Sequence, residues 1–230
     1  MSLVDRFLHR AEHGRFVPLL AALCVLFVSY PMALETGYVG WVRILFILVL
    51  VAAAFAQADR PSHLAITVAL AIPTAIGQLL VLVSPTQTVQ IWVTGITLLF
   101  VSYVITVVLA GVLRPGKVDG NRLAGAVSVY LLLGLAWTMV YALLVLLNPG
   151  AFHLPEDMAP VLDGSPEEYA FIYYNFVTLT TLGYGDITPI SPLARAASWM
   201  EAVAGQLYLA ILIARLVALQ IMDRAEGRSE

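Results

Sequence analysis

The residues with the clearest potential for chemistry lie in one short run in the last third of the chain. Residues 178–189 read Thr-Leu-Thr-Thr-Leu-Gly-Tyr-Gly-Asp-Ile-Thr-Pro. Carbonyls of an ordinary strand point in alternate directions, so left-handed residues are needed to aim them at one axis, and Gly183 and Gly185 adopt that conformation without steric cost. Four copies around an axis would present rings of oxygens that replace the hydration shell of a potassium ion. These oxygens are the carbonyls of Thr181, Leu182, Gly183 and Tyr184 and the Thr181 hydroxyl.

A short helix is expected to hold this run in place. Ser165 can cap it, Pro166 suits the first helical position, and Glu168 completes a capping box. The apolar residues that follow predict a helix over 165–180. Since a spanning helix needs about 20 residues, this one enters the membrane and stops, which requires burial in protein. Its C-terminal end would place a partial negative charge near the membrane centre, where it favours a cation.

This segment resembles the pore of tetrameric potassium channels, whose usual filter reads Thr-Val-Gly-Tyr-Gly. The resemblance covers residues 122–221. It implies a homotetramer that conducts K+ passively, with residues 181–185 as the selectivity filter and K+ held at residues 181–184. Leu182 stands where relatives have valine, so a weakly selective monovalent cation channel is the alternative.

The resemblance also implies which residues support the filter. Aromatic residues of the pore helix surround the filter in relatives, and one of them bonds an aspartate above it. Tyr173 and Tyr174 occupy those positions, Asp186 is that aspartate, and Thr180 ends the pore helix. Val177 replaces a glutamate that promotes filter inactivation in some members, so we expect that coupling to be absent.

The last apolar segment is expected to line the pore. Gly205 lies twenty residues after Gly185, a spacing at which relatives have a bending point. Gly205 is therefore interpreted as a hinge or as a place of close helix packing. The resemblance puts four residues toward the axis, with the first lining the wet cavity and the last two forming an apolar constriction that closes by dewetting. They are Gln206, Leu209, Ile213 and Val217.

Glu201 is a carboxylate well inside an apolar segment. Such groups are costly in a membrane and face protein or water. We hypothesise that Glu201 bonds the pore helix through the Thr178 hydroxyl, either as a static buried contact or as a group whose protonation influences gating.

Composition explains where such a pore would sit. The chain of 230 residues is 60% hydrophobic and 12% charged, whereas soluble domains average about 45–50% and about 25%. Its net charge of -3 and lack of a basic run give no indication of a nucleic-acid partner. The composition predicts an all-α integral membrane protein in contact with lipid, with six transmembrane helices and the re-entrant pore helix between the fifth and sixth. The six segments are 17–34, 40–57, 63–83, 89–113, 122–148 and 192–221.

Basic residues set the orientation. Arginines precede the first segment and follow the sixth, and Arg114, Lys117 and Arg122 lie between the fourth and fifth. Loops rich in Lys and Arg stay in the cytoplasm. We therefore expect both termini to be cytoplasmic and the protein to lie in the plasma (inner) membrane, and the short architecture suggests a prokaryotic source.

The segments divide the chain into a four-helix part, 17–113, and a pore domain, 123–222, joined by a linker at 114–122 and flanked by cytoplasmic ends at 1–16 and 223–230. This layout is that of voltage-gated channels, but residues 89–113 contain no basic residue. Since charge must move through the field to sense voltage, we expect little or no voltage sensing.

An alternative is that the four-helix part is a membrane enzyme or receptor fused to a pore. An enzyme would need ionisable residues that converge at one depth, and those of residues 17–113 lie near segment ends, so no enzyme or cofactor is expected. The segments leave only short ends at 1–16 and 223–230, so no cytoplasmic ligand-binding domain is expected. Arg43 pairs with Glu35 or lies at the membrane interface. A subunit that assembles only with different pore chains is the remaining alternative to a homotetramer.

Overall fold

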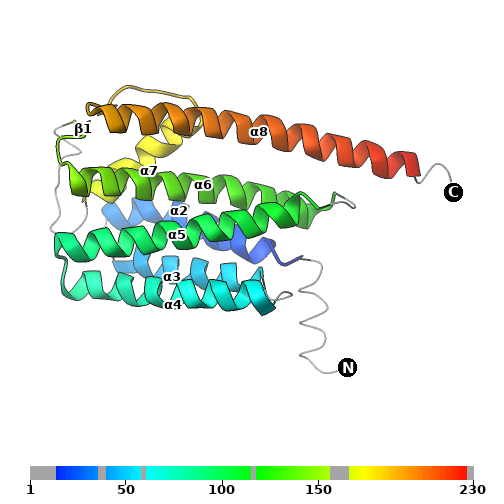
Figure 1. Cartoon of the computed structure of the whole chain (residues 1–230), viewed down its shortest axis with the longest axis horizontal. Coiled ribbons are helices and arrows are strands. Elements are labelled where there is room, and N and C mark those ends of the chain that lie inside the picture. Colours follow the sequence, from blue (N-terminus) through cyan, green and yellow to red (C-terminus); the bar gives the residue numbers. More distant parts are fainter. Residues whose placement is uncertain (1–13, 36–39, 58–60, 115–117, 156–165, 227–230) are drawn as a thin grey trace.

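The computed structural model describes the chain except residues 1–13, 36–39, 58–60, 115–117, 156–165 and 227–230. It is built almost entirely of helices (Figure 1). These are α2 (Val17–Glu35), α3 (Gly40–Phe55), α4 (Pro61–Val83), α5 (Gln87–Val112), α6 (Gly120–Leu147), α7 (Pro166–Leu179) and α8 (Pro192–Glu226). Two short strands, β1 (Phe152–His153) and β2 (Thr188–Pro189), pair antiparallel.

The helices begin and end close to the predicted segments because the signals that set them are local. Thr86 caps α5, and Asp119 caps α6 by accepting from the Arg122 amide at 2.9 Å. α8 continues to Glu226, past the expected end at Met222. In the described part of the chain, four helices are long and apolar enough to cross a membrane, namely α4, α5, α6 and α8, while α2 and α3 give shorter apolar stretches.

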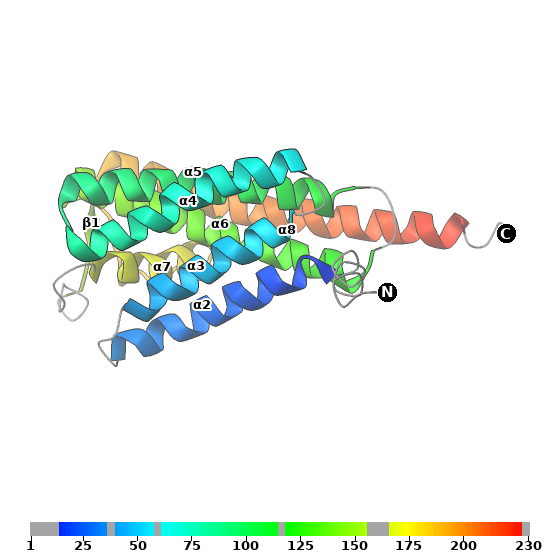
Figure 2. The ribbon, with the colours of Figure 1, turned by 90° about the horizontal axis from the view of Figure 1, so that it is seen from below.

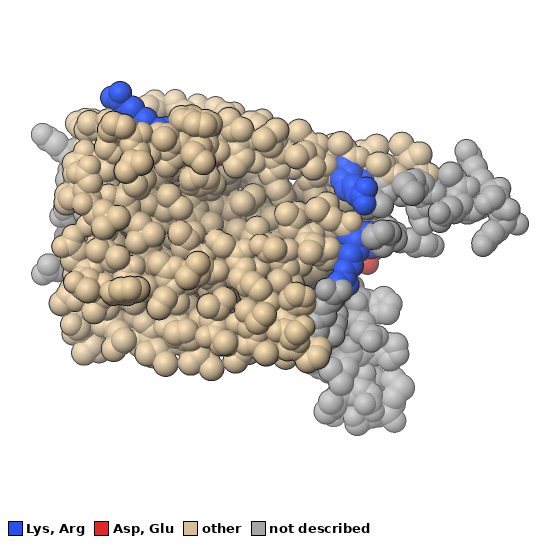
Figure 3. Space-filling model, in the orientation of Figure 1, with Lys and Arg blue, Asp and Glu red and all other residues tan. Residues whose placement is uncertain are grey.

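Two groups of helices lie on opposite sides of α6. Figure 1 shows α2 to α5 on one side and α7 and α8 on the other, and Figure 2 shows the C-terminal part of α8 extending beyond the other helices. α6 contacts α2 and α5 as well as α7 and α8. Figure 3 shows Lys and Arg side chains only near the two ends of the face that it draws. The long uncharged surface between them suits contact with lipid tails.

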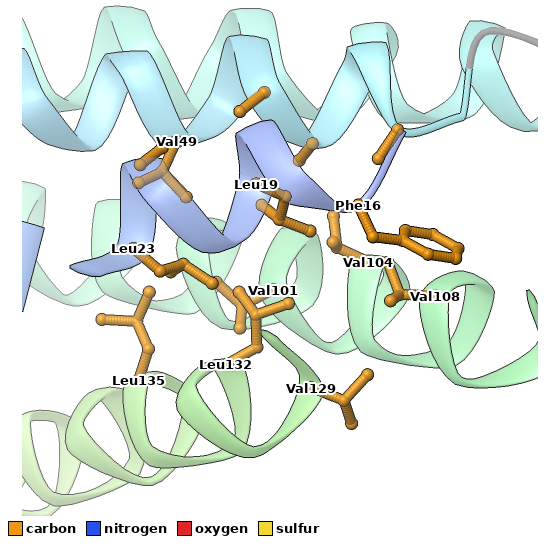
Figure 4. Packing of buried hydrophobic residues seen from close by; sticks show 14 of the residues in the cluster. Phe16, Leu19, Leu23, Val49, Val101, Val104, Val108, Val129, Leu132 and Leu135 are labelled. Carbon is orange, nitrogen blue, oxygen red and sulfur yellow. The ribbon is translucent and has the colours of Figure 1, made fainter. Parts of the chain in front are cut away.

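The main apolar core joins helices from both groups. Leu19 and Leu23 of α2 meet Val104 of α5 and Leu132 of α6 in this core (Figure 4). The same cluster reaches Leu212 of α8. Because lipid tails are as apolar as these side chains, close van der Waals packing holds such helices together in a membrane.

A contact that we call the Phe16 joint fastens the start of α2 to α5 and α6. The Phe16 amide donates to Asn121 Oδ1 at 2.8 Å, and the Arg15 guanidinium lies 4.9 Å from the ring centroid. A Cβ on Gly125 would lie 2.7 Å from the ring, and one on Gly111 would lie 3.0 Å from it. Glycine at both positions therefore makes room for the Phe16 ring, which is 3% exposed.

Polar side chains link α3, α4 and α5 inside the four-helix part. Arg43 donates to Gln78 Oε1 at 2.8 Å, and Gln78 donates onward to Thr97 at 3.4 Å. The side chain of Glu35, the expected partner of Arg43, lies outside the described residues. In the described structure, the partner of Arg43 is Gln78.

Candidate functional site

The end of α7 fixes the start of the 181–185 run. The Thr181 amide donates to the Thr178 carbonyl at 2.9 Å, and the Leu182 and Gly183 amides donate to the Val177 carbonyl at 2.9 and 3.2 Å. These bonds satisfy carbonyls that a helix end otherwise leaves without partners. They also direct three consecutive N–H groups back toward α7, which leaves the carbonyls of the run free.

Left-handed backbone conformations alternate along the run. Thr181, Gly183 and Gly185 have φ values of 60°, 61° and 79°. The positive φ values of the two glycines are as predicted from the sequence. The positive φ of Thr181 was not predicted, and this conformation is a steric outlier for threonine. Alternation of this kind turns successive carbonyls toward one side, in contrast to a strand. The Thr181 hydroxyl donates to the Thr180 carbonyl at 2.7 Å, and its oxygen keeps lone pairs for a cation.

All five residues of the run are exposed in the single chain, including the side chains of Leu182 and Tyr184. The run lies along α8 on the side away from α2 to α5 (Figure 1). The run therefore lies on a face that the other described residues do not cover.

Asp186 and two tyrosines form the outer support of the run. The Tyr173 hydroxyl donates to Asp186 Oδ2 at 2.6 Å, and Asp186 Oδ1 accepts from the Ile187 amide at 3.0 Å. The Tyr173 and Tyr184 rings stack with centroids 6.4 Å apart. The bond from Tyr173 is the main cause that lowers the pKa of Asp186, and the same bond raises the pKa of Tyr173 to about 12.

Tyr174 faces the inside of the domain instead. Its hydroxyl lies 2.6 Å from that of Ser198 on α8, and its ring packs at 5.1 Å from Tyr141 and 5.4 Å from Phe152. Val177 is buried, and Thr180 bonds the Phe176 carbonyl at 2.6 Å. Tyr173 and Tyr174 thus have different roles, because Tyr173 bonds Asp186 next to the 181–185 run whereas Tyr174 joins α7 to α8.

Glu201 is fully buried, but its predicted partner is wrong. Its Oε2 accepts a hydrogen bond from the Tyr141 hydroxyl of α6, and its Oε1 has no hydrogen-bond partner, so Thr178 does not bond it. The expected contact with α7 is replaced by one with α6. Tyr141, a polar-tipped residue within an apolar segment, was the signal for the true partner.

Gly205 lies against the end of α7. A Cβ there would be 2.5 Å from the Leu179 carbonyl oxygen, so close helix packing accounts for this glycine. The interpretation of Gly205 as a hinge of α8 stays a prediction.

The four residues predicted to face the axis do not form a common cluster within the single chain. Gln206, Ile213 and Val217 are exposed and Leu209 is partly buried. Sequence reasoning missed Tyr208 between them, whose hydroxyl donates to the Ala126 carbonyl of α6 at 2.6 Å and whose ring stacks on Tyr130. This contact fixes the middle of α8 to α6.

Comparison with known proteins gives one match. Residues 165–220, which include the 181–185 run and most of α8, match a family model described as ion channel. Neither the curated proteins nor the solved structures gave a match. The matched segment and the apolar helices able to cross a membrane support an ion channel embedded in a membrane.

Proposed function

We propose that the chain is one subunit of a homotetrameric, potassium-selective channel that conducts K+ passively. Four copies of residues 181–185 surround the axis, and their carbonyl oxygens, with the Thr181 hydroxyls, replace the water around each ion. Six helices cross the plasma (inner) membrane of a prokaryotic cell with both termini in the cytoplasm. The conducted ions are the only small partners that the activity requires.

The observation that carries this proposal is the alternation of left-handed residues at Thr181, Gly183 and Gly185. A row of aligned carbonyls that accept no hydrogen bond from the described residues, beside N–H groups that bond back to α7, is suited to a dehydrated cation. The same row is strained at Thr181, and strain of this kind persists where function requires it.

The uncovered face supports assembly with further copies of the same chain. Backbone without partners cannot face lipid, because each such group costs several kcal/mol there. Large apolar side chains of α8, including Leu207 and Ile211, are also exposed in the single chain. Identical subunits bring such faces together around one axis and remove the run from lipid.

The absence of basic residues in α5 supports weak voltage dependence. Its sequence from Gln87 to Val112 contains no Lys or Arg. Moving one charge across the membrane is worth about 2.3 kcal/mol per 100 mV, and α5 offers no such charge to move.

The test is current through purified protein in liposomes, with K+ on one side, Na+ on the other and the voltage stepped. We expect a reversal potential near the K+ equilibrium value and an open probability nearly flat in voltage. Reversal near zero would favour the weakly selective alternative, and Leu182→Val would then be expected to restore selectivity.

A glycine substitution provides the matched control. Gly183→Ala puts a side chain on a left-handed residue, φ 61°, which costs roughly 1–2 kcal/mol in each subunit, so we expect K+ flux to be lost. Gly95→Ala in α5 meets no atom within 4 Å and should leave flux in place. Equal flux through both variants would contradict the assignment of the filter.

A further inference from the structure

Glu201 is enclosed by three helices of its own chain. It lies on α8 and is 0% exposed, and Tyr141 of α6, its hydrogen-bond donor, is also 0% exposed. Tyr141 packs against Tyr174 of α7, which bonds Ser198 one turn before Glu201. The carboxyl group therefore sits where α6, α7 and α8 meet.

One oxygen of this carboxyl group has nothing to bind. Among the described residues, Oε1 has no hydrogen-bond partner, while Oε2 has Tyr141. Because the side chain is already buried within one chain, neither lipid nor a second copy can reach Oε1 from outside. An ionised carboxylate with an unpaired oxygen is far more costly to bury than a neutral acid.

The neighbouring groups do not offset a negative charge. The titratable groups facing Glu201 are tyrosines, Tyr141 and Tyr130 on α6 and Tyr174 on α7. Among the described residues, no Lys, Arg or His stabilises the negative charge of Glu201. One turn further along α8, Gly205 contacts the last residue of α7, and the C-terminal end of a helix repels a further negative charge.

We propose that Glu201 is a proton-binding site of the pore domain, with the proton on Oε1 and with Oε2 as the carbonyl oxygen that accepts from Tyr141. Loss of that proton puts an uncompensated charge between α6, α7 and α8 and loosens the contact of α8 with the helix that holds the filter. The structural part of the proposal concerns the chain alone, and its effect on conduction depends on the proposed channel function. The packed pore domain is therefore more stable at low pH, where Glu201 holds its proton, and becomes less stable as pH rises and that proton is lost.

The experiment is infrared difference spectroscopy of the whole protein in liposomes over a pH series. A protonated carboxyl group gives a carbonyl band that an ionised carboxylate lacks. We expect this band in the wild-type protein at neutral pH, its loss in Glu201→Gln, and its retention in the matched control Asp119→Asn, which changes an exposed carboxylate at the cap of α6.

Tyr141→Phe provides a second variant that does not alter Glu201 itself. It removes the donor to the ionised form, so the pH at which the band is half lost should rise by about one to two pH units. A side chain that only fills space would show no such shift. Wild-type K+ flux should fall over the pH range in which the band is lost, and the flux of Glu201→Gln should lose this pH dependence.

Three outcomes decide the matter. A Glu201 band that is absent at every pH, or that does not move in Tyr141→Phe, overturns the proton-binding site. A band that behaves as expected while flux is independent of pH overturns the link to conduction. A band that behaves as expected in a protein that passes no ions supports the proton site and overturns the proposed channel function.

Discussion

Thr181 has a backbone conformation that costs a residue of its type about 1–3 kcal/mol. Two features hold it there: its amide bonds the Thr178 carbonyl, and its hydroxyl bonds the Thr180 carbonyl. Glycines at 183 and 185 could be assigned left-handed angles from their residue type alone. No feature of residue type indicates the same for Thr181, because its conformation follows from the way that α7 ends.

At the outer end of the run, Asp186 predicts an acid-side pH dependence. Its lowered pKa means that the contact with Tyr173 adds stability above the unfolded pKa of about 3.9 and that this stability is lost as pH falls through the folded pKa. Tyr173→Phe removes the main cause of the shift, so under the proposed function the loss of K+ flux at acid pH should begin at a higher pH. The measurement is flux through liposomes over an acidic pH series.

Tyr103→Phe is the control for that series, since Tyr103 bonds His63 in the four-helix part at 2.9 Å. The K+ flux of Tyr103→Phe should fall over the same acidic pH range as that of the wild type. If K+ flux through Tyr173→Phe falls over the same pH range as in the wild type, the Tyr173–Asp186 bond does not stabilise the outer end of the proposed filter.

At the scale of elements, α8 meets α7 through Gly205. Gly205→Ala places a methyl group 2.5 Å from a backbone oxygen and 2.8 Å from the Leu179 side chain. Backbone cannot give way as a side chain can, so we expect a destabilisation of about 1–3 kcal/mol, seen as a lower thermal unfolding temperature of the purified protein.

The same variant separates the two interpretations of Gly205. Lower thermal stability indicates close packing, whereas unchanged stability with reduced flux indicates a hinge. If neither quantity changes, the contact between Gly205 and Leu179 has no importance for the protein.

The helices themselves could be predicted closely from the sequence, and their partners could not. Runs of apolar residues, caps such as Asp119 and breaks such as Asn148 are local signals, so α6 could be bounded to within a few residues. The partner of Glu201 lies 60 residues away along the chain. The packing of α6 against α8, which no local signal gives, brings Tyr141 to the carboxyl group.

At the scale of the whole molecule, the four-helix part is fastened to α6 of its own chain. Phe16→Ala empties the space that Gly111 and Gly125 provide, and such a change costs about 3–5 kcal/mol in a packed core. We expect a lower unfolding temperature and faster hydrogen exchange at the start of α2. Val17→Ala is the control, since Val17 is exposed next to the joint. Equal effects of the two variants would mean that the Phe16 joint does not hold α2.

This attachment has a consequence for the order of biosynthesis. The main core already joins α2, α3, α5, α6 and α8 within a single chain, so a newly inserted subunit needs no second copy to complete this packing. Under the proposed function, residues 181–185 and the exposed apolar face of α8 wait for partners. Maturation then has two stages: a subunit folds alone, and its ion pathway comes into being at assembly.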